Sequence, residues 1–214
     1  MLEISKLDVS IGSVTILRDV NMQVGERRFV GLIGRNGAGK TTLMRAIMGI
    51  LPAKAGSISY LGKTIDRTPT HMRARGGIGY MPEDRRLIPT LTVEENVLVP
   101  AWAGARADAE ERLARVYRMI PEVETFRARK GLQLSGGQQK LVALARALMS
   151  GTKLLLLDEP FEGVAPVLAR RLTEVIAGLK AEGLSIILTE SDVSHSADML
   201  DRTYHIDRGA VTPA

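Results

Sequence analysis

The chain has 214 residues, 45% of them hydrophobic and 25% charged, with a formal net charge of +5. This length and apolar content suffice for one folding unit with a substantial core. The lack of cysteine excludes disulfides and thiolate metal sites, and no apolar run approaches the roughly 18 residues of a membrane-spanning helix. Basic and acidic residues are interspersed, so the charge does not indicate nucleic acid as a partner.

The N-terminal region predicts two antiparallel strands and then a strand, a loop and a helix. Residues 2–11 and 14–24 alternate between apolar and polar side chains, as half-buried strands do. The dense apolar run 29–33 predicts a buried strand, and the periodicity of residues 41–51 predicts a helix that Pro52 closes.

The rest of the chain predicts an alternating α/β order with a helical segment in its middle. We expect strands near 57–65 and at 78–81, helices at 94–102, 107–120 and 136–150, a strand at 153–158, a helix at 167–183, a strand at 184–190, a helix at 194–201 and a strand pair over 202–212. The run of four leucines before Asp158 is typical of a strand buried on both faces of a parallel sheet.

A glycine-rich loop follows the strand 29–33 and fits the P-loop pattern. Glycines let the backbone wrap a phosphate with its N–H groups at the positive end of the next helix. Lys40 adds a point charge for the β- and γ-phosphates, and the Thr41 hydroxyl is a ligand for Mg²⁺. The nucleotide-binding residues predicted here are Gly34, Arg35, Asn36, Gly37, Ala38, Gly39, Lys40, Thr41 and Thr42.

Asp158 and Glu159 supply the two carboxylates that a P-loop site needs, one for magnesium and one for the attacking water. An acid at the carboxyl end of a buried strand can hold magnesium through water, and the acid beside it can polarise the attacking water. We expect Asp158 in the first role and Glu159, together with Lys40, in catalysis. The alternative is a strand that ends in a solvated acidic turn.

A second phosphate-binding surface is predicted before the helix 136–150. Its hydroxyl, flexible N–H groups and helix N-terminus can bind an anion, although a glycine pair there is often only a helix cap. The residues are Ser135, Gly136, Gly137 and Gln138.

The order of these three motifs resembles the ABC transporter ATPase family over essentially the whole chain. The resemblance implies an α/β P-loop NTPase (RecA-like) core with an N-terminal antiparallel β region, as a single domain over 1–214. The core would comprise 1–83 and 151–214, with an inserted α-helical subdomain at 84–150. It also implies hydrolysis of ATP with Mg²⁺.

Within this family, two such chains, identical or homologous, form a head-to-tail dimer in which Ser135 and Gly137 of one act on the ATP of the other. The resemblance implies transmembrane permease subunits as partners and a peripheral position at the cytoplasmic face of the cell membrane. The segments 78–86 and 91–96 look like the ATPase subunits of branched-chain amino acid importers and their urea and amide relatives. Glu83 lies where most members have a glutamine that contacts the magnesium shell, and a carboxylate can also ligate magnesium.

Two positions depart from the family pattern. Ile11 aligns with the aromatic residue that stacks on adenine, unless Tyr60 or Phe29 reaches the base instead. Ser191 aligns with the switch histidine, and His195 and His205 lie in a predicted helix and strand away from that position.

Two rival functions stay open. A regulatory module that holds ATP without turnover is suggested by the two departures, although Glu159 opposes it. A soluble ABC protein acting on DNA or ribosomes usually has a coiled-coil insertion or two fused ATPase domains, and this chain has neither.

Overall fold

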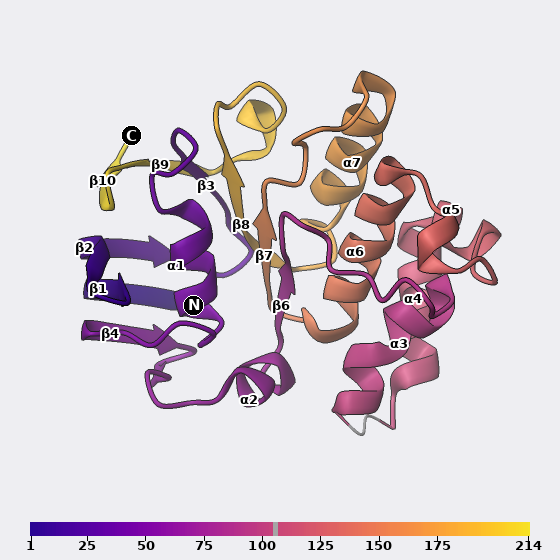
Figure 1. Cartoon of the computed structure of the whole chain (residues 1–214), viewed down its shortest axis with the longest axis horizontal. Helices are drawn as coiled ribbons and strands as arrows, with labels where there is room; N and C mark the ends of the chain where they lie inside the picture. The colour runs from indigo at the N-terminus through magenta and orange to yellow at the C-terminus, as the bar shows by residue number, and fades with distance from the viewer. Residues whose placement is uncertain (105–106) are drawn as a thin grey trace.

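The computed structural model describes residues 1–104 and 107–214 and contains two β-sheets with helices between and beside them (Figure 1). Residues 105–106, which fall inside the predicted helical subdomain, lie outside the described residues. An antiparallel sheet has the order β2-β1-β4-β5, made of β1 (Leu2–Ile11), β2 (Val14–Val24), β4 (Ala55–Tyr60) and β5 (Lys63–Thr64). The second sheet has the order β10-β9-β3-β8-β7-β6, made of β3 (Phe29–Ile33), β6 (Ile78–Met81), β7 (Leu154–Asp158), β8 (Ser185–Glu190), β9 (Arg202–Asp207) and β10 (Ala210–Pro213).

The second sheet is parallel except for β10, and its strands β3, β7 and β8 are buried at every position. Because successive side chains of a strand point to opposite faces, the leucine run of β7 divides between two cores. Leu154 and Leu156 pack with α1 (Lys40–Ile47) and the antiparallel sheet, whereas Leu155 and Leu157 pack with helices on the other face. The prediction of a doubly buried strand is confirmed.

The remaining helices gather beside the parallel sheet (Figure 1). They are α3 (Val93–Ala103), α4 (Ala109–Met119), α5 (Pro121–Thr125), α6 (Gly136–Ser150) and α7 (Pro166–Gly178), with α2 (Thr70–Arg75) near β6. The longest of them, α6, contacts α3, α4 and α5 as well as β6 and β7. It therefore connects the helical cluster to the sheet. None of the helices in the described part of the chain is long and apolar enough to cross a membrane.

Three predicted helices are wrong in extent. The first ends at Ile47 rather than before Pro52, because Gly49 adopts a left-handed φ of 70° that stops a helix. The helix predicted at 167–183 ends at Gly178, after which the backbone bonds take the tighter i to i−3 pattern of turns. The segment 194–201 forms only a short 3₁₀ turn, Ala197–Met199. There the Asp192 carboxylate accepts a hydrogen bond from the Ser194 backbone at 2.8 Å, a local bond that competes with helix formation.

The carboxyl ends of three neighbouring parallel strands position the site. The strand β3 lies beside β8, and β8 lies beside β7, with Ile33 opposite Glu190 and Asp158 opposite Thr189. Ligand sites of open α/β sheets form at this edge, where the loops after the strands converge. The P-loop follows β3, Asp158 is the last residue of β7, and Glu159 comes directly after it.

Candidate functional site

The P-loop connects the buried strand β3 to α1 in a conformation that requires glycine. Gly37 and Gly39 have φ values of 81° and 114°, which residues with a Cβ rarely adopt. A Cβ on Gly34 would lie 2.2 Å from the Ile206 carbonyl oxygen. The loop therefore turns tightly into α1, whose N-terminus has no side-chain cap, so that its N–H groups can receive an anion.

Asp158 ends β7 fully buried and accepts three hydrogen bonds. The Thr41 hydroxyl donates to its Oδ1 at 3.2 Å, the Thr189 hydroxyl to the same oxygen at 3.0 Å, and the Tyr80 hydroxyl to Oδ2 at 3.1 Å. Burial raises the pKa of Asp158, and these hydrogen bonds act in the opposite direction. The predicted magnesium residues Thr41 and Asp158 are thus in direct contact.

Glu159 forms a buried ion pair with Lys40. The Lys40 Nζ lies 2.9 Å from Glu159 Oε1, and the same ammonium donates to the backbone carbonyls of Gly34 and, at 3.1 Å, of Arg35. Burial raises the pKa of Glu159, and the Lys40 ammonium opposes that shift. The Glu159 backbone has a left-handed φ of 49°, a conformation that costs about 1–2 kcal/mol for a residue with a Cβ.

One cavity brings most of the predicted nucleotide site together. It has a volume of about 430 Å³ and is lined by Ile16, Asn36, Gly37, Gly39, Lys40, Thr41, Thr42, Glu83 and Glu159. Glu83, the predicted magnesium ligand of the loop after β6, lies on its wall. The motif residues, which are far apart in the sequence, therefore face a common space.

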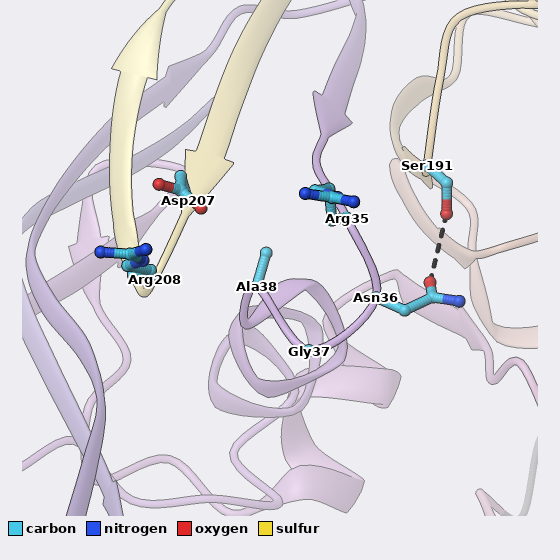
Figure 2. A pocket seen from close by; sticks show the side chains of 7 residues that line it. All are labelled: Arg35, Asn36, Gly37, Ala38, Ser191, Asp207 and Arg208. Carbon is cyan, nitrogen blue, oxygen red and sulfur yellow. Dashed lines mark hydrogen bonds between the residues drawn. The ribbon is translucent and has the colours of Figure 1, made fainter.

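A second cavity of about 710 Å³ adjoins the other side of the P-loop (Figure 2). Its walls are Arg35, Asn36, Gly37, Ala38, Ser191, Asp207 and Arg208. The Ser191 hydroxyl donates to Asn36 Oδ1 at 3.2 Å, as Figure 2 shows. The residue at the predicted switch position therefore contacts the P-loop directly.

The second phosphate-binding motif lies away from both cavities. Ser135 caps α6, where its hydroxyl accepts from the Gln138 backbone at 3.3 Å and the Gln138 side chain accepts from the Ser135 backbone at 3.0 Å. Neither Ser135, Gly136, Gly137 nor Gln138 lines either cavity. The geometry of a helix cap is present, and a single chain does not bring this motif to its own P-loop.

Neither cavity beside the P-loop is lined by the aromatic residues considered from the sequence, Tyr60 and Phe29. Ile11 is 49% exposed and lines neither cavity. Phe29 and Tyr60 are buried in the two cores, so the alternative that one of them reaches the base is wrong. His195 lies in a turn rather than a helix, with its ring 5.1 Å from that of Phe161.

Sequence reasoning missed three polar partners of the acids. Tyr80 and Thr189 hold Asp158, and Lys140 donates to the Glu159 carbonyl. Thr189 and Tyr80 lie on β8 and β6, the strands on either side of β7, so the strand order would have located both. Nothing in the local sequence pattern indicated the contact of Lys140.

A parallel sheet, a P-loop at its carboxyl edge and an adjacent pair of acids define a P-loop nucleoside triphosphatase. The family model described as ABC transporter matches residues 17–162. The chain is 35% identical over 211 residues to the high-affinity branched-chain amino acid transport ATP-binding protein BraG of Pseudomonas aeruginosa, covering 99% of this chain and 91% of that protein. The chain belongs to the ABC transporter family, as an ATPase subunit.

Two further comparisons agree with this assignment. The lipopolysaccharide export system ATP-binding protein LptB of Escherichia coli is 36% identical over 196 residues, covering 91% of this chain and 81% of that protein. A dimeric ATP-binding cassette in a post-hydrolysis state, bound to ADP and phosphate, superposes with a TM-score of 0.89 at 25% identity, covering 100% of this chain and 98% of that one.

Proposed function

We propose that this chain hydrolyses Mg-ATP by attack of water on the γ-phosphate and couples that reaction to a membrane permease. The observation that carries the proposal is the cavity in which the P-loop, Lys40, Thr41 and Glu159 meet. Phosphoryl transfer depends mainly on positioning and charge neutralisation, which these groups supply.

The residues around Asp158 fit a magnesium ion. Mg²⁺ prefers hard oxygen ligands and keeps several waters, and the Thr41 hydroxyl and the Asp158 carboxylate present such oxygens side by side. Among the described residues there is no cluster of three or more carboxylates, histidines or cysteines that could cage a metal. We infer that Thr41, Asp158 and Glu83 hold magnesium together with the nucleotide phosphates, and that the ion neutralises phosphate charge.

The Lys40–Glu159 pair suggests how ATP prepares the base. In the structure the Glu159 carboxylate is bound to the P-loop ammonium. A γ-phosphate competes for the same ammonium, and this competition frees the carboxylate to orient the attacking water and accept its proton. Glu159 and Lys40 would therefore exchange partners during each cycle.

The working unit we propose is a head-to-tail pair of cassettes. Ser135 and Gly137 lie away from the chain's own cavities, so they are available to a nucleotide held by a second chain. That second chain is either another copy or a homologous ATPase subunit. The dimeric form of the similar cassette supports this arrangement.

For the transported solute we propose branched-chain amino acids or related small amides, moved inward, with the chain attached to permease subunits at the cytoplasmic face of the membrane. The near-complete coverage of BraG supports this solute class. Lipopolysaccharide export is the second candidate, because LptB is similar at the same level of identity.

Uptake of radiolabelled leucine tests the solute class. The gene for this chain would be deleted in its host and restored either as wild type or as Glu159→Gln. Uptake that returns only with the wild type supports the proposal. Normal leucine uptake in the deletion strain, combined with a defect in lipopolysaccharide export, would favour the second candidate.

A further inference from the structure

Lys140 is a buried lysine whose amine contacts the backbone of the proposed base. It lies on α6 and is 1% exposed. Its Nζ donates to the Glu159 carbonyl oxygen at 2.6 Å. Lys140 lines neither of the two cavities beside the P-loop, so it acts on the site only through what it contacts.

The Glu159 peptide is held from both sides in its left-handed conformation. Its N–H donates to the Thr189 hydroxyl at 2.9 Å, while its carbonyl accepts from Lys140. The other donor to that carbonyl is the Glu162 backbone, at a longer 3.3 Å. A left-handed residue with a Cβ persists only when its surroundings determine it, and the Lys140 bond is the shorter of the two that fix the carbonyl.

The surroundings of Lys140 are costly for a cation. Burial, followed by the nearby Arg85 charge, lowers its pKa to about 8, while Glu162, Glu83 and Glu159 act in the opposite direction. Burying an amine costs free energy unless the amine finds a hydrogen-bond acceptor, and the Glu159 carbonyl is the acceptor that Lys140 contacts. An amine and an ammonium can both donate to a carbonyl, so the contact does not depend on the protonation state.

The helix that carries Lys140 begins at the Ser135 motif and also holds the loop that contains Glu83. The Arg146 guanidinium donates to the backbone carbonyls of Arg85 and Arg86, the latter at 2.7 Å, and Arg85 donates to the Gln139 side chain at 3.2 Å. A displacement of α6 would therefore be transmitted both to that loop and to the peptide of Glu159.

We propose that Lys140 is a positioning residue that fixes the backbone of Glu159 and links its carboxylate to the helix bearing the second phosphate-binding motif. Binding of that motif to the nucleotide of a partner chain would thus alter the position of the catalytic base Glu159 in this chain. The inference rests on the proposed role of Glu159.

The test compares Lys140→Met, which keeps the length of the side chain and removes the donor, with the exposed control Lys63→Met. Steady-state phosphate release from Mg-ATP is measured at one high concentration of each full-length variant. We expect kcat to fall at least about tenfold in Lys140→Met with KM for ATP within about twofold, because a misplaced catalytic group slows the chemical step without altering binding. The control should match the wild type. Because removing the donor to a buried carbonyl also lowers stability, all rates are compared at a temperature at which every variant is fully folded.

Two further variants separate positioning from a general structural role. Lys140→Gln retains an N–H donor and should recover part of the lost rate; if Lys140→Met does not fold, Lys140→Gln is compared with the wild type instead. In a Glu159→Gln background, Lys140→Met should add no further loss, since both changes act through one group.

A kcat for Lys140→Met within about twofold of the wild type would overturn the proposal, as would a multiplicative loss in the double variant. A rate for Lys140→Gln that is no higher than the rate for Lys140→Met would also count against the proposal. If Lys140→Met does not fold, a Lys140→Gln rate equal to that of the wild type would overturn the proposal. If Glu159→Gln itself retains the wild-type rate, the assignment of Glu159 as the catalytic base fails. If Glu159→Gln is inactive and Lys140→Met has the wild-type rate, only the role of Lys140 fails.

Discussion

Replacement of Lys40 by alanine tests the electrostatic core of the site. The Lys40 ammonium is 5% exposed and lies 2.9 Å from the Glu159 carboxylate. Two unit charges about 4 Å apart interact by about 4 kcal/mol at an effective dielectric constant of 20. A phosphate that binds this ammonium displaces Glu159 and two backbone carbonyls, so the net contribution is smaller. We expect a loss of about 3 kcal/mol, or roughly a 10²-fold weaker Kd for Mg-ATP.

Isothermal titration calorimetry of Lys40→Ala with Mg-ATP measures this loss directly, with the exposed Lys63→Ala as the matched control. The variant also leaves Glu159 buried without its counterion, so the pKa of Glu159 should rise above its wild-type position, and hydrolysis at saturating ATP should slow. A Kd for Lys40→Ala within about threefold of the wild type would refute the assignment of Lys40 to the phosphates.

Three other perturbations address Asp158, Glu190 and the recognition of the nucleobase. Tyr80→Phe removes a 3.1 Å hydrogen bond to Asp158 and should weaken the apparent magnesium affinity by about 1–2 kcal/mol; an unchanged magnesium dependence of phosphate release would contradict this. Burial raises the pKa of Glu190 from 4.5 to about 7 although Ser196 donates to it. The folded chain therefore binds more protons than the unfolded one between these values, so stability falls as the pH rises through that window. Glu190→Gln should be about 1–2 kcal/mol more stable at pH 8, with the gain lost below the lower value, and equal stability of the two proteins in urea at pH 8 would argue against it. Because none of the described residues that line the two cavities is aromatic, ATP and GTP should bind within about tenfold, and Ile11→Tyr should tighten ATP binding several-fold; a much larger preference for ATP in competition binding would show another means of base recognition.

The elements predicted best from the sequence are those whose burial pattern is set locally. The leucine run 154–157 and the apolar run 29–33 have enough apolar side chains for both faces of a sheet, and each forms the expected strand. The segment 194–201 failed because the Asp192 carboxylate accepts from the Ser194 backbone, a local bond that competes with helix formation. The end of α1 was misplaced because the conformation of Gly49 outweighs the apolar residues that follow it.

The P-loop and the two acids could be located from the sequence because each motif consists of contiguous residues. The hydrogen-bond partners of the acids could not be located in this way, because those contacts join residues distant in the sequence. Thr189 lies 31 positions from Asp158 in the chain and Tyr80 lies 78 positions away. The contact of Lys140 with the Glu159 carbonyl depends on how α6 packs against the sheet, and no sequence period encodes that.

Phosphate release by the wild type and by Glu159→Gln, measured at matched ATP occupancy over a series of chain concentrations, tests the central claim most directly. The account predicts that the wild-type rate per chain rises with concentration, since two cassettes form the working unit. It also predicts that Glu159→Gln binds Mg-ATP as tightly, is trapped as an ATP-bound dimer and releases phosphate at least about 10²-fold more slowly. A Glu159→Gln variant that stays monomeric and hydrolyses ATP at the wild-type rate would contradict it.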